Sequence, residues 1–382
     1  MTSRPIFVVL ASIGVALAVP ALVTASSAVS LSLDQASGPV TIAIEAPLSG
    51  PQASNGRDML RGVQLAVRQA NERGGVLGRR IKLLPLDDKA SPSLARSVAR
   101  RAIAAKAVGV IGPYNSSVGI INLPVYVAAK VVPIHLTSTD ETTGKGLTVQ
   151  PKNSQISPVE ARYFATQRAR RVAMLVDPST YTKGMADRLM RILKSRGGEV
   201  ATVPIVAGRQ SYSSEVAEAL SSKPQFVYVS TYYPEGSKIA RSLLAAAAGN
   251  TAFGCFMGLA NVDPAFVSEA GIPASRFCRY SGVPTAAQIP TAAAYVRQYR
   301  AAFRTSPGVW GTFTYDSTNL LLAAIRDTQT FEYRALMRNL LNTRGYKGAT
   351  GTISINPSTG NRTNVPVYIL TVNAAGQFVT TG

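Results

Sequence analysis

The sequence has little of the residue types on which most catalytic and metal sites depend. Among its 382 residues are one histidine, His135, and two cysteines, Cys255 and Cys278. These counts exclude zinc ribbons, Cys/His metal clusters and knottin-like disulfide frameworks. A histidine-dependent triad could use only His135. That residue lies in the apolar segment Val-Val-Pro-Ile-His-Leu, which favours a buried position at the end of a strand.

The common motifs of phosphate binding and nucleophilic catalysis are also missing. Neither G-x-G-x-x-G after a strand nor G-x-x-x-x-G-K occurs, and there is no G-x-S-x-G nucleophile elbow. The adjacent carboxylates Asp87 and Asp88 follow a predicted strand, where such a pair more often caps local backbone than performs acid–base chemistry. We therefore expect a protein that is not an enzyme and that needs no metal or cofactor.

Acidic residues are scarce relative to basic ones. There are 40 Lys and Arg against 20 Asp and Glu, which gives a net charge of +20. The clusters Arg79–Arg80, Arg100–Arg101 and 168–171 contain no interleaved aromatic residues, so they predict solvated helix faces rather than nucleic-acid binding. A field of this sign attracts anionic ligands, and anionic cell-surface polymers as well.

The N-terminus resembles an export signal. Arg4 precedes an apolar run over residues 5–25, and small-x-small cleavage sites end at Ala25 and Ala28. We predict a signal peptide over residues 1–28; the alternative is an uncleaved anchor, which would be the only membrane contact. No cysteine follows the run, which excludes a lipoprotein anchor there. We expect a periplasmic, cell-surface or extracellular protein, in a compartment that permits disulfides.

After residue 38, short β-branched runs alternate with amphipathic stretches, which predicts an α/β fold with two doubly wound parallel-sheet units. The predicted strands are 40–48, 81–86, 107–111 and 131–136 in the first unit, and 171–176, 200–206, 225–230, 252–258 and 277–281 in the second. From residue 291 the chain is mainly helical, and it closes with strands 352–355 and 367–372, predicted to pair.

The two cysteines fall in the last two strands of the second unit, separated by a predicted helix. A strand–helix–strand segment brings its strands side by side, so a disulfide between Cys255 and Cys278 is geometrically possible. The alternative is two buried thiols that pack as small hydrophobes.

Polar residues follow five of the predicted strands, at the edge where open α/β sheets bind ligands. Hydroxyls and backbone N–H groups at helix N-termini suit a carboxylate or another anion. Each group by itself is also a normal helix cap, and their convergence is what favours a site. The segments are 47–51, 114–117, 137–140, 178–181 and 231–235.

A series of short motifs stands in a recognisable order: Ala-Pro-Leu-Ser-Gly-Pro at 46–51, Gly-Val-Gln-Leu-Ala at 62–66, Gly-Gly-Val-Leu-Gly-Arg at 74–79, Asp-Asp at 87–88 and Val-Ile-Gly-Pro at 110–113. The set resembles type I periplasmic binding proteins, specifically the branched-chain amino acid (leucine/isoleucine/valine) binding family. The similarity covers nearly all of residues 40–375.

The resemblance implies a two-lobed, non-enzymatic, monomeric receptor with a three-strand hinge that delivers a small ligand to ABC permease subunits. The crossovers are expected near Ile156, Val283 and Lys347. These make an N-terminal lobe of 40–156 with 284–347, and a C-terminal lobe of 157–283 with 348–382. A ligand sensor that uses the same clamp without transport is the alternative.

The resemblance also implies a ligand site. The carboxylate-binding serine of the family falls on Ser116, and its contacts after the next strand fall on Thr137, Ser138 and Thr139. The second-lobe tyrosines fall on Tyr181 and Tyr232, and an aromatic that lines the side-chain pocket falls on Trp310.

Three features of the family pattern are missing. Met257 stands where the family has the glutamate that pairs with the ligand ammonium, and Asn55 replaces an aromatic. Ser91 and Asn115 stand near the places of the usual first-lobe disulfide. The ligand is thus a branched-chain or related amino acid if Glu235, Asp140 or Asp316 supplies the missing charge. Otherwise it is an aromatic or short-chain acid without an amine, against which Met257 would pack well.

Overall fold

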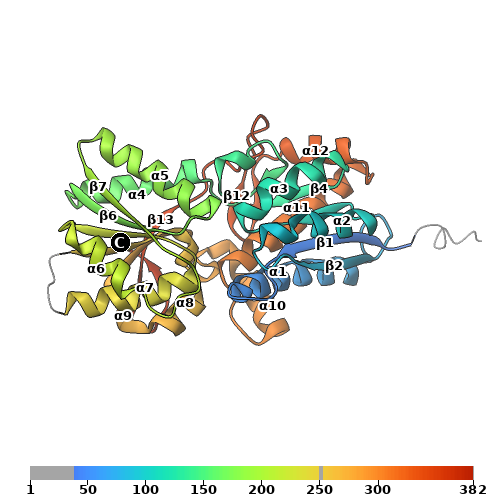
Figure 1. Ribbon diagram of the computed structural model, residues 1–382. Coiled ribbons are helices and arrows are strands. Elements are labelled where there is room, and N and C mark those ends of the chain that lie inside the picture. Colours follow the sequence, from blue (N-terminus) through green and yellow to red (C-terminus); the bar gives the residue numbers. More distant parts are fainter. Residues whose placement is uncertain (1–37, 249–252, 382) are drawn as a thin grey trace, which may run out of the picture. The chain divides into compact units, whose positions relative to one another are not determined.

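The computed structural model of the protein describes residues 38–248 and 253–381, so the predicted signal peptide lies outside the described residues (Figure 1). The strands are β1 Val40–Ala46, β2 Ile81–Asp87, β3 Gly109–Ile111, β4 Val132–His135, β5 Leu147–Thr148, β6 Arg171–Val176, β7 Glu199–Pro204, β8 Phe226–Ser230, β9 Gly254–Met257, β10 Cys278–Gly282, β11 Tyr346–Gly348, β12 Gly351–Ile353, β13 Tyr368–Val372 and β14 Phe378–Thr380. The helices are α1 Ala53–Glu72, α2 Ala95–Ala104, α3 Ser116–Ala128, α4 Asn153–Thr166, α5 Thr180–Ser195, α6 Ser213–Ser221, α7 Tyr233–Ala247, α8 Pro264–Ala270, α9 Ile272–Phe277, α10 Ala293–Phe303, α11 Val309–Thr328 and α12 Tyr333–Leu341.

The two main sheets share one winding. The first has the order β2-β1-β3-β4-β5, and all its neighbours are parallel. The second repeats this order as β7-β6-β8-β9-β10, again parallel, and then adds β13 and β14 antiparallel. The predicted fold class is confirmed. In such sheets the ligand edge is the carboxyl end of the strands, beside the point where the strand order reverses.

Helices α1 and α11 pack against each other without space for a side chain at their crossing. A Cβ atom on Gly62 would lie 2.0 Å from the carbonyl oxygen of Gly311, so any residue with a side chain there would push the helices apart. The Asp58 carboxylate accepts hydrogen bonds from the Gly308 N–H (2.9 Å) and the Gly311 N–H (2.6 Å). These contacts fix the start of α11, and with it the position of Trp310.

The predicted pairing of 352–355 with 367–372 is wrong. Strand β12 pairs with β11 in a separate two-stranded sheet, and β13 lies between β10 and β14. The connection between β12 and β13 instead reaches the first sheet, where the guanidinium of Arg362 is buried and donates to Val149 O (3.2 Å), Thr350 Oγ1 (2.9 Å) and Thr350 O (2.9 Å). The connection between β12 and β13 is therefore anchored beside β5 and does not form a hairpin turn between the two strands.

Several elements have no counterpart in the sequence prediction. Helix α4 and the short strands β5, β11 and β14 were not predicted, whereas the helix predicted between the two cysteines is present as α8 and α9. Helix α4 contains an internal proline, Pro158, which normally argues against a helix. Its buried residues Ala161 and Phe164 pack with Val172 of β6, so tertiary packing decides the outcome there.

Cys255 and Cys278 are joined in a disulfide that links neighbouring strands. The two residues are direct partners in the parallel register of β9 and β10, and their Cα atoms are 4.5 Å apart. The bridge joins two adjacent strands of the second sheet near their amino-terminal ends, since Cys278 is the first residue of β10 and Cys255 the second of β9.

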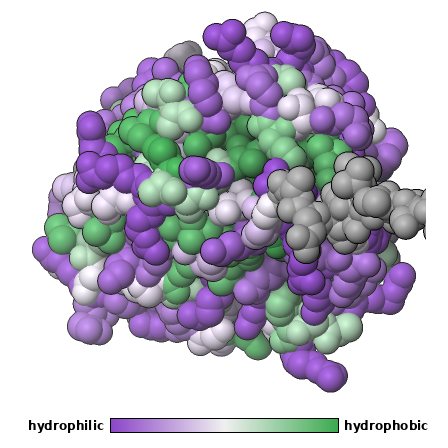
Figure 2. All heavy atoms as spheres, turned by 90° about the vertical axis from the view of Figure 1, so that its right-hand side faces the viewer, coloured by the Kyte–Doolittle hydropathy of each residue, from purple (hydrophilic) through white to green (hydrophobic). Residues whose placement is uncertain are grey.

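Most members of the arginine clusters lie at the surface. Arg80, Arg100, Arg101, Arg168 and the residues 170–171 are exposed, and hydrophilic residues surround the apolar patches on the face drawn in Figure 2. The clusters are solvated as predicted, but of the three the Arg100–Arg101 cluster lies on a helix, α2, whereas Arg79–Arg80 and residues 168–171 lie outside the described helices.

Candidate functional site

One small cavity is surrounded by ten residues. They follow the carboxyl ends of strands of both sheets or begin α11. They enclose about 10 Å³, measured as the space open to the centre of a water molecule. One water needs roughly this much, so the side chains must move apart to admit anything larger. The lining residues are Tyr114, Ser116, Leu136, Ser138, Gln150, Tyr181, Tyr232, Leu259, Ala260 and Trp310. Larger hollows lie elsewhere, such as the one of about 550 Å³ between α11 and α12, which is lined by none of the predicted site residues.

Four helices present their N-terminal ends to this cavity. Ser116 is the first residue of α3, Tyr181 the second of α5 and Trp310 the second of α11, while Tyr232 is the N-cap of α7. Each N-terminus carries a partial positive charge and free backbone N–H groups. Their convergence makes the cavity favourable for an anion although no cationic side chain lines it among the described residues.

Ser116 is almost completely buried, and its hydroxyl proton is free. Its Oγ accepts a hydrogen bond from the Thr139 N–H at 3.3 Å, and the described residues offer that hydroxyl no acceptor. A hydroxyl that accepts one hydrogen bond keeps its own proton, which rotates toward an available acceptor. The geometry is therefore that of a donor to a ligand oxygen.

The loop after β4 is placed differently from what the resemblance implies. The Ser138 hydroxyl lines the cavity, but it donates to Pro151 O (2.8 Å) and accepts from Gln150 Nε2 (2.9 Å). Thr137 Oγ1 lies 2.8 Å from His135 Nδ1 and 2.7 Å from Thr142 Oγ1, outside the lining. Of the three predicted contacts in this loop, Ser138 alone reaches the cavity, and its proton is already used.

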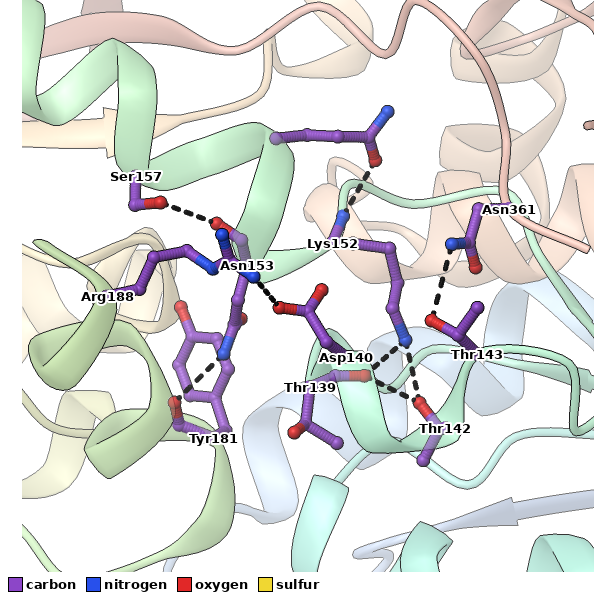
Figure 3. Close-up of polar contacts among 11 residues, drawn as sticks. Thr139, Asp140, Thr142, Thr143, Lys152, Asn153, Ser157, Tyr181, Arg188 and Asn361 are labelled. Atoms are coloured by element: carbon purple, nitrogen blue, oxygen red, sulfur yellow. Dashed lines mark hydrogen bonds and ion pairs between the residues drawn. The ribbon is translucent and has the colours of Figure 1, made fainter. Parts of the chain in front are cut away.

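A buried lysine, Lys152, holds the same loop in place through hydrogen bonds to Thr139 and Thr142 (Figure 3). The Lys152 ammonium donates to the Thr139 carbonyl oxygen and to Thr142 Oγ1 (2.7 Å). Burial lowers the pKa of Lys152 to about 8, partly opposed by the charge of Asp140. Because these are uncharged acceptors on one loop, Lys152 positions the loop and does not contact the cavity. Nothing in its sequence context, Gln-Pro-Lys-Asn, signals this role.

Four aromatic rings form the apolar wall. The ring centroids of Tyr114 and Trp310 are 5.2 Å apart, those of Tyr114 and Tyr232 6.1 Å, and those of Tyr181 and Tyr232 5.7 Å. Tyr181 Oη and Trp310 Nε1 are buried without a hydrogen-bond partner among the described residues. Two unpaired donors beside a small cavity are costly unless a ligand satisfies them.

Four of the predicted site residues do not line the cavity: Thr137, Thr139, Met257 and Asn55. Met257 ends β9 and is buried in the core. Asn55 lies on α1, where its side-chain N–H donates to Tyr114 Oη at 3.3 Å and so orients a ring that does line the cavity.

The sequence prediction missed Tyr114, Gln150, Leu136, Leu259 and Ala260, all of which line the cavity. Tyr114 lies in a strand-end segment that the sequence marked, and it could have been found there. Gln150 follows β5, a two-residue strand with no sequence signal.

None of the three acids suggested as ammonium partners lines the cavity. Asp316 accepts from the Ala349 N–H (2.8 Å) and from Thr350 Oγ1 (2.6 Å). Asp140 forms an ion pair with Arg188, and Glu235 accepts from the Gly208 N–H (3.1 Å). These carboxylates are engaged in local structure elsewhere.

The residues set aside as candidates for catalysis have structural roles. Burial, with the nearby Lys152 charge, lowers the pKa of His135 well below its usual value, so it is neutral at the end of β4. Asp87 accepts from the Leu48 N–H (2.9 Å) and from Ser49 Oγ (2.6 Å), which is the predicted capping role.

Within residues 38–248 and 253–381, no three His, Cys, Asp or Glu side chains gather as metal ligands would. No helix in this part of the chain is long and apolar enough to cross a membrane.

Several contacts join the elements of the first sheet to those of the second around the cavity. Tyr233 Oη donates to Pro51 O (2.7 Å), Ser54 Oγ donates to Asp263 Oδ1 (3.1 Å), and the Thr180 N–H donates to Ser117 Oγ (3.1 Å). The Asp140–Arg188 pair adds an electrostatic link between the β4 loop and α5 (Figure 3). The two sheets thus face each other in a closed arrangement around the site.

Two equally wound sheets closed over a cavity at their carboxyl edges define a two-lobed binding protein. Residues 39–377 match the family model of periplasmic binding proteins, and the chain belongs to that family. The resemblance drawn from the short motifs is therefore confirmed.

A curated relative is also similar in sequence. The Leu/Ile/Val-binding protein BraC3 of Rhizobium johnstonii is 33% identical over 231 residues, which are 59% of this chain and 63% of that protein. The match thus spans less than two thirds of that relative's length.

Solved structures share the fold. The leucine binding protein LivK of Thermotoga maritima aligns with a TM-score of 0.81 and 24% identity, over 90% of this chain and 98% of that one. A solute binding protein of Rhodopseudomonas palustris, solved in complex with 3,4-dihydroxy benzoic acid, aligns with a TM-score of 0.79 and 19% identity, over 90% and 95%.

Proposed function

We propose that this protein is an exported solute-binding protein that closes two lobes over a small carboxylate and presents it to the permease of an ABC importer. The observation that carries the proposal is the cavity itself, where four helix N-termini and the donors of Ser116, Tyr181 and Trp310 converge without a cationic side chain among the described residues. Such a site binds an anion through hydrogen bonds and releases it when the lobes part.

The proposed lobes are residues 40–156 with 284–347 and residues 157–283 with 348–382. Residues 1–28 would direct export. The names of relatives that bind leucine, isoleucine and valine support a small carboxylate ligand, and so does the benzoate-type ligand of a protein with the same fold. The work of the site is binding and release, with no bond made or broken.

The proposal is tested by ligand-induced stabilisation together with lobe closure. A ligand at about 100 times its Kd adds roughly 2.7 kcal/mol to the free energy of unfolding, which a thermal-shift screen of carboxylates detects. Small-angle scattering on the same samples should show a smaller radius of gyration with the ligand that stabilises. In cells, deleting the gene should abolish uptake of that ligand.

Complementation separates binding from folding. The wild-type gene should restore uptake, and Ser116→Ala should not. Ser97→Ala is the matched control, since Ser97 is exposed on α2 and donates only to Leu94 O. If no carboxylate stabilises or compacts the protein, the proposal fails.

A further inference from the structure

We infer that the ligand is a carboxylate that carries a neutral hydroxyl and no ammonium group. This inference rests on the proposed function and narrows its substrate class. It depends on the charge of the cavity wall and on which of its polar atoms are left without partners.

The charge of the cavity wall disfavours an ammonium group on the ligand. The side chains that line the cavity are hydroxyl, amide, indole or hydrocarbon, and none of these described residues is acidic. An ammonium buried there would lose its hydration without gaining an anionic partner, which costs several kcal/mol. A neutral group at the same position carries no such cost.

The buried acids whose charges act on the tyrosines of the wall already have hydrogen-bond partners. Glu160 accepts from Ser281 Oγ (2.6 Å) and from Tyr228 Oη (3.2 Å). The Asp177 carboxylate accepts from the Ser179 N–H (2.8 Å) and from Thr182 Oγ1 (2.7 Å), at the start of α5. Asp263 accepts from the Ala265 N–H (2.7 Å) and caps α8. Turning Asp263 toward a ligand would break a helix cap, and turning Asp177 would break its bonds to the Ser179 N–H and the Thr182 hydroxyl, so neither is a ready partner for an ammonium.

The side-chain amide of Gln150 has an orientation that is fixed by its hydrogen-bond partners. Its Nε2 donates to the Leu136 carbonyl oxygen and to Ser138 Oγ (2.9 Å), and only an N–H can face a carbonyl. Its Oε1 is therefore the free end, and it is buried without a partner among the described residues. An uncharged acceptor in the wall calls for one neutral donor on the ligand.

The unpaired atoms together specify the ligand. Tyr181 Oη and Trp310 Nε1 are donors that need an acceptor, which a carboxylate supplies, and Ser116 adds a third proton. Gln150 Oε1 needs a donor, which a hydroxyl supplies. The apolar part of the ligand would lie against Tyr114 and Tyr232.

The test uses two matched trios in which only one group changes: leucine, leucic acid and isocaproic acid; and phenylalanine, phenyllactic acid and phenylpropionic acid. Within a trio, ammonium, hydroxyl and hydrogen occupy the same carbon. Calorimetry on the purified protein should give the smallest Kd for the hydroxy acid. The acid without either group should bind about 5- to 10-fold more weakly, for the lost hydrogen bond. The amino acid should bind at least about 100-fold more weakly.

A charge-changing variant tests the role assigned to the amide. Gln150→Glu places an anion where the neutral acceptor lies, so the ratio of amino-acid to hydroxy-acid affinity should rise at least about 10-fold. Gln64→Glu is the matched control, because Gln64 is exposed on α1, and it should leave the ratio unchanged. If Gln150→Glu does not fold, the wild-type trios still decide.

The outcomes separate the two proposals. Tightest binding of an amino acid in either trio overturns the inference and leaves the proposed function standing. An unchanged ratio in a folded Gln150→Glu variant also overturns the inference. If none of the six acids stabilises the protein, the inference about the ligand is wrong. If, in addition, no other carboxylate lowers the radius of gyration, the proposed function is wrong as well.

Discussion

Breaking the ion pair between Arg188 and Asp140 should weaken ligand binding by a small, calculable amount. Arg188 lies on α5 and Asp140 in the loop after β4, so the pair links elements of the two sheets (Figure 3). Their side chains are 33% and 39% exposed, and pairs this exposed contribute about 0.2–1 kcal/mol. If the link forms only on closure, the whole contribution enters the binding free energy. Arg188→Gln should then raise Kd by about 1.4- to 5-fold.

The assay is a double-mutant cycle of Arg188→Gln and Asp140→Asn, with Kd measured by calorimetry at low and high salt. The matched control is Lys183→Gln, which breaks the Lys183–Asp187 pair (2.6 Å) within the same helix and touches only one sheet's elements. The coupling energy should be positive at low salt and shrink at high salt. The reasoning is refuted if Arg188→Gln and Lys183→Gln have equal effects, or if the coupling energy is zero.

Three further perturbations follow from buried contacts. Ser116→Ala should weaken carboxylate binding by about 1–3 kcal/mol in calorimetry, and an unchanged Kd would remove Ser116 from the site. Burial raises the pKa of Glu160 from 4.5 to about 7. The native state therefore binds this proton more tightly than the unfolded state, and stability is lost as pH rises from 4.5 through 7. Glu160→Gln should flatten that loss in urea unfolding at pH 5 and pH 8, and parallel curves for both proteins would contradict it. Replacing Cys255 and Cys278 by serine reopens a loop of 23 residues and should lower the free energy of unfolding by about 3 kcal/mol. An unchanged denaturation midpoint would argue against a stabilising bridge.

The parallel sheets could be predicted because their signal is local. Buried strands such as β1 and β6 are mostly apolar runs between amphipathic helices, and that alternation is compatible with few other folds. The end of the chain could not be predicted in this way. The connection between 352–355 and 367–372 is anchored by Arg362, whose partners Val149 and Thr350 follow from three-dimensional contacts and not from strand propensity.

The candidate site was predictable at the level of loops and less so at the level of side chains. The resemblance placed Ser116, Ser138, Tyr181, Tyr232 and Trp310 in segments that do line the cavity. Within the β4 loop, however, neighbouring side chains point in different directions, so Thr137 turns to His135 while Ser138 reaches the cavity. Orientation here is decided by the buried Lys152 ammonium and its acceptors, a long-range packing effect.

The neutral cavity and the strongly positive chain would have different effects on the recognition of an anion. A net charge of +20 raises the local concentration of any anion near the surface without distinguishing one from another. A lysine or arginine inside the cavity would bind many anions tightly and release them slowly, because a buried ion pair is costly to separate. Hydrogen bonds from Ser116, Tyr181 and Trp310 discriminate by geometry and weaken as soon as the lobes part and water enters. Association should therefore depend on salt through the surface charge, whereas specificity should depend on the uncharged wall.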